Sequence, residues 1–328
     1  MKDSASCPER LPSYGGQALI EGVMMRGSRA VAVAMRAPDG QIVIHTEPLS
    51  GIYTSKWIKI PFLRGLVSLW DALGLGMRFL TMSANLQTGE EEKIEGKEMV
   101  LTLIVSLSIA LGLFFATPAF LGWLTERFLG LSGFWSNLIE GLIRLLAIIG
   151  YMWLVAKMPE IARVFAYHGA EHKTINAYES RADLTPSNVL EYSLEHPRCG
   201  TAFLLTLVLL SVLVFTAIGP LPVFERIATR IVLIPALAGI AYEYLRWTAR
   251  HLENPIVRLL ISPNLALQRM TTREPDANMV EVAITAFNAM LEKEHVLENQ
   301  AIVKAPSLTT EPIPTAKKTA GFSESKVP

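Results

Sequence analysis

The chain has 328 residues, of which 51% are hydrophobic and only 18% are charged. Its 30 basic and 30 acidic side chains balance to a net charge of zero, which argues against nucleic-acid binding because nucleic-acid-binding domains carry a basic face. Soluble domains are about a quarter charged, whereas a protein lying almost wholly in lipid would be more apolar than this one. We therefore expect a chain that lies partly in the lipid bilayer and partly in the cytosol.

The N-terminal residues 1–59 are expected to form a small cytosolic β region. Large and small side chains alternate from Val31 to Met35, and the turn sequence Pro38-Asp39-Gly40 precedes a second apolar run. Residues 60–98 are interpreted as an amphipathic helix at the membrane interface followed by a charged linker, because a narrow polar stripe runs through an otherwise apolar segment.

Four segments are predicted to cross the membrane as helices, two within residues 99–158 and two within residues 201–247. A bilayer core of about 30 Å requires roughly 20 apolar residues in a helix. The first and third segments each lie in a run of more than 25 uncharged residues. The second and fourth contain charges, which normally face the interior of a bundle, and Glu140 and Arg144 are spaced to pair with each other on one helix face.

The basic residues predict that both termini lie in the cytoplasm. Loop 159–200 contains Arg163, Lys173, Arg181 and Arg198, whereas the loops predicted on the other side of the membrane are poor in lysine and arginine. Residues 248–299 are expected to form cytosolic helices, which prolines such as Pro263 divide into short pieces. Residues 300–328 are expected to be a disordered tail.

The strongest functional signal is the sequence His168-Gly169-Ala170-Glu171-His172 in the cytosolic loop. On a helix the two histidines and the glutamate point into one arc about a turn high. Two imidazoles at this spacing can bind one Zn²⁺, and the adjacent carboxylate can accept a proton from water, as in the inverzincin motif. We interpret His168 and His172 as metal ligands and Glu171 as a general base.

Further candidate ligands lie at the end of the same loop, in His196-Pro197-Arg198-Cys199. In an open, catalytic site, His196, Glu179 or Glu243 would be the third ligand, and water would take the fourth position. In a closed, structural site, His196 and Cys199 would both bind the ion. Two alternatives are that these side chains are ordinary polar groups hydrogen-bonded to their surroundings, or that Cys199 is a nucleophile near His196, although the sequence offers no third member.

Four stretches resemble the YqhQ-like family of bacterial membrane proteins, a family of unknown function described as predicted metal-dependent enzymes. These stretches are residues 14–27, 167–178, 196–201 and 271–276, and the resemblance extends from residue 13 to residue 297. It implies a multi-span protein of the bacterial cytoplasmic (inner) membrane. It also adds four residues as candidate members of the site, namely Glu21, Arg26, Arg273 and Glu274.

We therefore predict a mainly α-helical protein, a four-span transmembrane bundle with a small N-terminal cytosolic β region and an interfacial amphipathic helix. Its proposed activity is that of a zinc-dependent hydrolase acting on a peptide or a lipid-like substrate. The alternative is a non-catalytic membrane scaffold or assembly factor with a structural metal site or none, whose cytosolic ends bind a protein partner. A transporter built on Glu140, Arg144 and Arg230 is the least favoured reading, because the sequence shows no inverted repeat.

Overall fold

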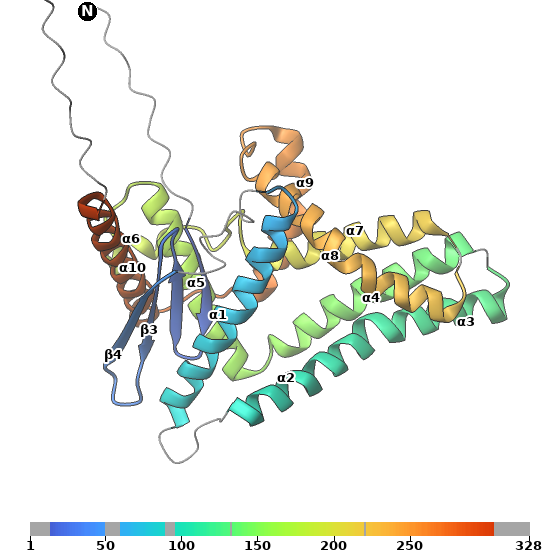
Figure 1. Ribbon diagram of the computed structural model, residues 1–328, viewed down its shortest axis with the longest axis horizontal. Helices are drawn as coiled ribbons and strands as arrows, with labels where there is room; N and C mark the ends of the chain where they lie inside the picture. Colours follow the sequence, from blue (N-terminus) through green and yellow to red (C-terminus); the bar gives the residue numbers. More distant parts are fainter. Residues whose placement is uncertain (1–13, 50–59, 89–95, 132, 220, 305–328) are drawn as a thin grey trace, which may run out of the picture.

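The computed structural model describes residues 14–49, 60–88, 96–131, 133–219 and 221–304. The start of the predicted β region, most of the charged linker and the tail from residue 305 onward lie outside these ranges. Figure 1 shows an elongated molecule, in which a sheet packed with helices occupies one end and long helices extend away from it.

The predicted β region is a four-stranded antiparallel sheet in which each strand pairs with the next along the chain. Its strands are β1 (Gly15–Leu19), β2 (Gly22–Arg26), β3 (Ala30–Arg36) and β4 (Ile42–Pro48). The register places Ala34 of β3 opposite Val23 and Ile44. Gly40 adopts a φ of +87° in the predicted turn between β3 and β4, a conformation that glycine reaches without steric cost.

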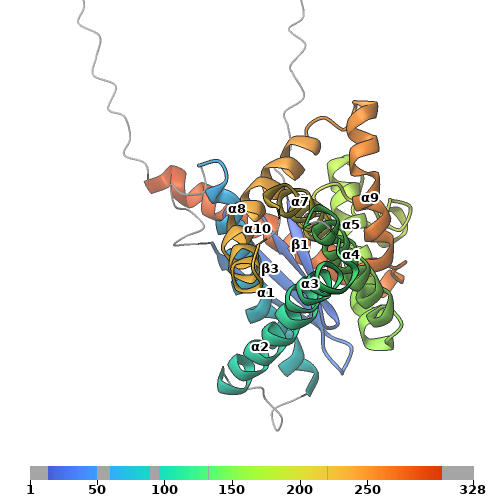
Figure 2. The same ribbon diagram turned by 90° about the vertical axis from the view of Figure 1, so that its right-hand side faces the viewer.

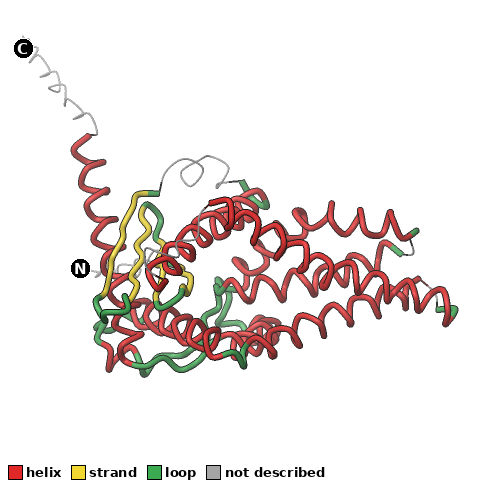
Figure 3. The backbone as a smooth tube through the Cα atoms, turned by 90° about the horizontal axis from the view of Figure 1, so that it is seen from below, coloured by secondary structure: helices red, strands yellow, loops and turns green. Residues whose placement is uncertain are grey.

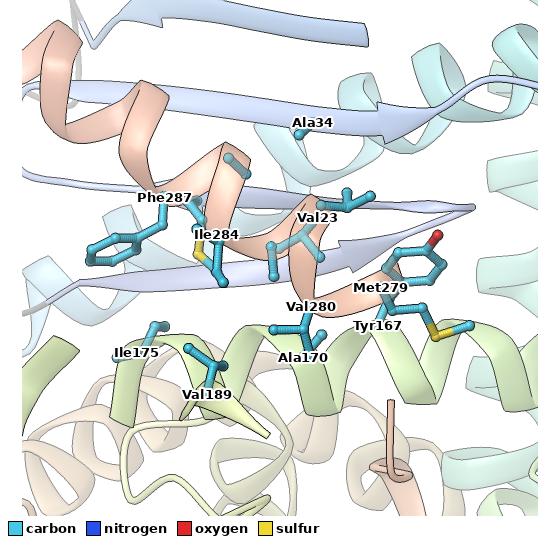
Figure 4. Packing of buried hydrophobic residues seen from close by; sticks show 14 of the residues in the cluster. Val23, Ala34, Tyr167, Ala170, Ile175, Val189, Met279, Val280, Ile284 and Phe287 are labelled. Atoms are coloured by element: carbon cyan, nitrogen blue, oxygen red, sulfur yellow. The ribbon is translucent and has the colours of Figure 1, made fainter. Parts of the chain in front are cut away.

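Helices cover both faces of this sheet. The face that includes Val23, Ala32 and Ala34 packs against α5 (Pro159–Glu179) and α10 (Ala277–Lys304), as Figure 4 shows around Val280 and Phe287. The opposite face packs against α1 (Leu63–Thr88), where the contacting side chains include Leu75 and Phe79. The alternation of alanine with larger residues along β3 therefore reflects a strand buried on both sides. We call β1–β4 with α1, α5, α6 (Pro186–Val189) and α10 the sheet region.

The long helices form a bundle that points away from the sheet region (Figures 1 and 3). α2 (Gly96–Leu111), one π-helical turn η3 (Gly112–Ala116) and α3 (Thr117–Leu129) follow one another without a break. α4 (Gly133–Val155), α7 (Gly200–Ile218) and α8 (Val223–Thr248) lie beside them, as the view along the bundle in Figure 2 shows.

Three helical stretches are long and apolar enough to cross a membrane, namely Val100–Leu129, Gly133–Val155 and Gly200–Ile218. They carry exposed apolar side chains such as Leu107, Leu146 and Leu213, which are compatible with contact to a lipid bilayer. α8 has 26 residues, but its charged side chains lower its hydropathy, and the predicted fourth span is not confirmed by length and composition.

Four charged side chains of the long helices are buried within the bundle, namely Glu140, Arg144, Arg226 and Arg230. Arg144 donates a hydrogen bond to Glu140 at 2.8 Å, as their spacing predicts, and Arg230 of α8 donates to the same carboxylate at 3.0 Å. At the far end of the bundle, Arg226 pairs with Glu126 at 2.8 Å. These ion pairs join α3, α4 and α8, so the charges face other helices rather than lipid.

α9 (Pro255–Thr271) corrects one expectation, since it continues through Pro263 instead of breaking there. A proline removes one N–H from the helix and leaves a carbonyl without its partner. Here the Ser262 hydroxyl donates to the carbonyl of Leu259, four residues before Pro263, and so supplies the missing hydrogen bond. α10 also extends farther than predicted, because it reaches Lys304 within the segment expected to be disordered.

Candidate metal centre

The motif residues lie on α5, which begins with Pro159 at its first turn and is surrounded by other elements along its second half. Two glycines permit these close contacts. A Cβ atom on Gly169 would lie less than 3.0 Å from the backbone carbonyl oxygen of Arg273, and one on Gly16 of β1 would lie 2.9 Å from the side chain of Glu171. The sheet and the chain after α9 can therefore approach α5 closely.

Backbone carbonyl groups hold His168 and His172 in defined orientations. His168 Nδ1 lies 2.9 Å from the carbonyl oxygen of Thr271, and His172 Nδ1 lies 2.6 Å from that of Leu194. A carbonyl oxygen only accepts hydrogen bonds, so both Nδ1 atoms carry the hydrogen, and in the neutral rings Nε2 keeps its lone pair. Histidines that bind metals are commonly oriented in this way.

Cys199 lies at the N-terminal cap of α7 and meets the two histidines. Its Sγ atom is 3.2 Å from His168 Nε2, and ligand atoms of His168, His172 and Cys199 all lie within 4.8 Å of one another. Zn²⁺ binds imidazole nitrogen and thiolate sulfur at about 2.0–2.3 Å, so two of its ligands lie at most about 4.6 Å apart. The donor types therefore suit a zinc ion, whereas the 4.8 Å that bounds the separations of the three ligand atoms is slightly wider than one ion requires. His172 and Cys199 are buried.

Glu171 faces the sheet and is not part of this group of three. Its carboxylate accepts a hydrogen bond from the backbone N–H of Gly16, and Oε2 is buried without a hydrogen-bond partner among the described residues. Burial raises the pKa of Glu171 to about 7, although the nearby His168 and the Gly16 N–H act in the opposite direction. A carboxyl group with such a pKa can exchange a proton near neutral pH.

His196 lies beside the group of three, with its ring centroid 5.5 Å from that of His172. Its Nε2 atom is 3.9 Å from Glu179 and 3.5 Å from Arg198, and these two residues form an ion pair with each other. Burial lowers the pKa of His196 to about 4, so the ring is neutral at pH 7. The Gln268 side chain binds both the N–H and the carbonyl of His196, which fixes the loop before Cys199.

Two further candidates from the sequence, Glu243 and Glu21, pair with arginine side chains. Glu243 pairs with Arg64 of α1. Glu21, which adopts a φ of +51° between β1 and β2, accepts hydrogen bonds from Arg163 Nε at 2.5 Å and from the Tyr167 hydroxyl at 3.2 Å. The Arg163 hydrogen bond holds the pKa of Glu21 below its usual value.

Two of the remaining motif residues contact α5 or the residues that precede it. Glu274 pairs with the buried Lys173 at 3.0 Å. Arg273 donates its backbone N–H to the carbonyl of Phe165 at 3.0 Å, and its guanidinium binds the carbonyl of Ala156. Arg26 ends β2. The stretches that resemble one family thus include contacts that hold α5 in place.

Three residues that hold the site were not predicted from the sequence. Lys173 donates to the carbonyls of Leu190 and Tyr192 at 2.8 and 2.7 Å, and Asn176 donates to those of Ser193 and Glu195. Together with Gln268, they fix the loop that presents the Leu194 carbonyl to His172. Their spacing offers one signal, since Lys173 and Asn176 lie three residues apart on the same face of α5.

Known proteins match most of the chain. Residues 60–293 match the family described as "Protein of unknown function (DUF1385)". The chain is 36% identical over 302 residues to the uncharacterized protein YqhQ of Bacillus subtilis (strain 168), an alignment that covers 88% of this chain and 95% of that protein. No solved structure matches the chain. These matches confirm the resemblance seen in the sequence, and the chain belongs to the DUF1385 family of proteins of unknown function.

Proposed function

We propose that this protein is a zinc-dependent hydrolase of the bacterial cytoplasmic membrane, with its metal centre on the cytosolic side. The observation that carries the proposal is the meeting of His168, His172 and Cys199, whose ligand atoms lie within 4.8 Å of one another. Three protein ligands with one open coordination position are the usual arrangement of a catalytic zinc site.

The four-span topology rests on the arrangement of the bundle. The connections from α3 to α4 and from α7 to α8 lie at the end of the bundle remote from the sheet region, as Figure 1 shows. α8 runs antiparallel beside α7 and buries Arg226 and Arg230 against other helices, which supports a fourth crossing despite its charges. The basic loop 159–200 then lies on the same side as the sheet and α10, which the positive-inside rule assigns to the cytoplasm.

Each residue of the centre has a distinct part in the proposed reaction. A bound Zn²⁺ would supply Lewis acidity toward a carbonyl or phosphoryl oxygen. His168 and His172 would hold the ion through Nε2, while the Thr271 and Leu194 carbonyls keep both rings in position. Glu171 would accept the proton of the attacking water at Oε2, the oxygen that has no partner among the described residues. His196 would remain outside the ligand set and position Arg198 and Glu179.

The second candidate is a membrane scaffold in which the same three residues bind a structural metal and the cytosolic part binds a protein partner. The burial of His172 and Cys199, at 1% and 6% exposure, favours it, because structural zinc sites are closed to solvent. The ion would then join α5 of the sheet region to α7 of the bundle.

Metal analysis of the full chain purified in detergent tests the proposal. We expect about one zinc per chain in the wild type, and loss of most of it in His168→Ala, His172→Ala and Cys199→Ser. His251→Ala is the matched control, because His251 follows the end of α8 and its side chain contacts Trp247, through the Trp247 carbonyl and ring, rather than the three ligands. Wild-type protein without metal, or metal that persists in His168→Ala, would overturn the metal centre.

Glu171→Gln separates the catalyst from the scaffold. The glutamine keeps the shape of the side chain but cannot accept the proton, so we expect normal zinc content and a roughly 10²–10⁴-fold lower rate. The rate is measured on a panel of fluorogenic ester, phosphoester and peptide substrates. Zinc content near one per chain with no hydrolysis of any panel substrate above the His168→Ala background would favour the scaffold.

A further inference from the structure

A cavity of about 640 Å³ lies where α1, the start of α7 and the end of α8 meet. This volume falls within the roughly 300–1,000 Å³ typical of sites for small molecules. Cys199 is one of the residues that line it, so the cavity extends to the candidate metal centre.

Most of the cavity wall is apolar. Leu69 of α1, Phe203 and Leu204 of α7 and Leu245 of α8 contribute to it. Leu204 is also 50% exposed on the surface of a helix that is long and apolar enough to cross a membrane. The wall is therefore continuous with the surface expected to contact acyl chains, and it suits a hydrocarbon better than a polar peptide.

The cavity also has a basic part. Arg246, in the last turn of α8, and Arg250, two residues after the end of α8, both line it. Neither forms an ion pair with an acidic side chain in the part of the chain that the structure describes, whereas Arg198, which also lines the cavity, is paired with Glu179. Two guanidinium groups without an ion pair among the described residues, beside an apolar wall, are complementary to a phosphate joined to acyl chains.

We infer that this cavity binds an anionic phospholipid, with its acyl chain against Leu69, Phe203 and Leu204 and its phosphate at Arg246 and Arg250. The inference rests on the proposed function and gives it a substrate class, because the cavity brings this lipid to Cys199 at the edge of the metal centre. A binding site between span helices at the cytosolic end of a bundle also has direct access to the inner leaflet.

Native mass spectrometry of the full chain in detergent tests the inference with three probes. Dioctanoyl phosphatidylglycerol carries chains and a net negative charge, dioctanoyl phosphatidylcholine carries chains without net charge, and glycerol 3-phosphate carries the phosphate alone. We expect one phosphatidylglycerol per chain, bound about ten-fold more tightly than phosphatidylcholine, and no saturable binding of glycerol 3-phosphate. Equal affinity for the two lipids, or saturable binding of glycerol 3-phosphate, would overturn the proposal.

One variant removes the charge of the basic part of the cavity, and another fills its apolar part. Arg246→Gln/Arg250→Gln should reduce phosphatidylglycerol binding to the level of phosphatidylcholine. Gly200→Leu should weaken both lipids, because a Cβ atom on Gly200 meets no atom within 4 Å and its side chain would extend into the cavity without disturbing the fold. The control is Gly150→Leu, at an exposed glycine of α4 whose Cβ also meets no atom within 4 Å.

Zinc content measured on the same samples separates this inference from the proposed function. Arginine-dependent binding of phosphatidylglycerol to a protein without zinc would sustain the lipid site and overturn the hydrolase. Zinc at one per chain with lipid binding that Gly200→Leu does not weaken would overturn the lipid site and leave the metal centre in place.

Discussion

Replacement of Glu140 by glutamine tests how far the bundle depends on one buried carboxylate. Glu140 is 1% exposed and accepts hydrogen bonds from Arg144 at 2.8 Å and from Arg230 at 3.0 and 3.1 Å. Two arginines and one glutamate give this cluster a charge of +2 − 1 = +1. Glu140→Gln raises the charge to +2 and leaves two buried guanidinium groups without a counter-ion.

Two independent magnitudes agree on the cost of this substitution. Removal of one partner from a buried ion pair costs about 3–5 kcal/mol, and an uncompensated arginine at the centre of a membrane-spanning helix costs about 2.5–3.5 kcal/mol. We expect Glu140→Gln to lower the free energy of unfolding by about 3 kcal/mol, which lowers Tm by roughly 6–12 °C. Arg230→Gln should cost less, because Glu140 then keeps Arg144 and the cluster becomes neutral.

Thermal unfolding in detergent, followed by tryptophan fluorescence, measures these differences. Glu225→Gln is the control, since Glu225 is an exposed residue in the first turn of α8 and its substitution should change stability by less than about 0.5 kcal/mol. The reasoning fails if Glu140→Gln unfolds at the same temperature as this control, or if Arg230→Gln is the more destabilising of the two cluster variants.

Two further predictions concern the surroundings of α5. Gly169→Ala should destabilise the fold by about 1–3 kcal/mol, because its Cβ would lie less than 3.0 Å from the Arg273 carbonyl. The control Gly150→Ala should be neutral or stabilising, because a Cβ on Gly150 meets no atom within 4 Å. Equal thermal stability of the two variants would contradict this prediction. Glu21→Gln should cost up to about 1 kcal/mol at pH 7, since its ion pair with Arg163 is partly exposed. The pKa of Glu21 is lowered in the folded protein, so this contribution is present above pH of about 4.3 and is lost as the pH falls through the lower folded value. A difference between wild type and Glu21→Gln that persists at pH 2.5 in urea unfolding would contradict the pairing.

The parts of the fold that the sequence predicts well are those with local signals. The turn at Gly40 and the pairing of Glu140 with Arg144 each depend on residues within four positions of one another. The third partner, Arg230, lies 90 residues beyond Glu140, and no local pattern joins the two. The sequence shows only that both are charges in apolar segments, and that such charges face the bundle.

For a related reason, the sequence does not show that both faces of β3 are buried. Alternating alanine and valine is typical of a strand with one face on a core, and Ala32 and Ala34 would equally suit an outer face. In the structure these alanines face α10, whose close approach requires small side chains, while Val31 and Val33 face α1. Which helix covers a sheet depends on contacts between segments that are distant in the sequence.

The candidate site was predictable as a set of residues but not as a geometry. The motif placed His168 and His172 on one helix face, and α5 confirms that spacing. Cys199 reaches His168 because Lys173, Asn176 and Gln268 fix the intervening loop through backbone carbonyls and amides. The spacing of Lys173 and Asn176 places both on one face of α5, but it does not show which carbonyls they bind. The sequence therefore could not predict that Cys199 lies nearer to the histidines than His196 does.

The position of Cys199 distinguishes the two proposed functions more sharply than the ligand set does. A metal that only joins α5 to α7 needs neither a cavity at its cysteine nor arginines that line that cavity. An apolar cavity reduces the packing that stabilises a fold. The cavity of about 640 Å³ that Cys199 lines, and the guanidinium groups of Arg246 and Arg250 that line it too, therefore favour a centre that a ligand reaches from the membrane.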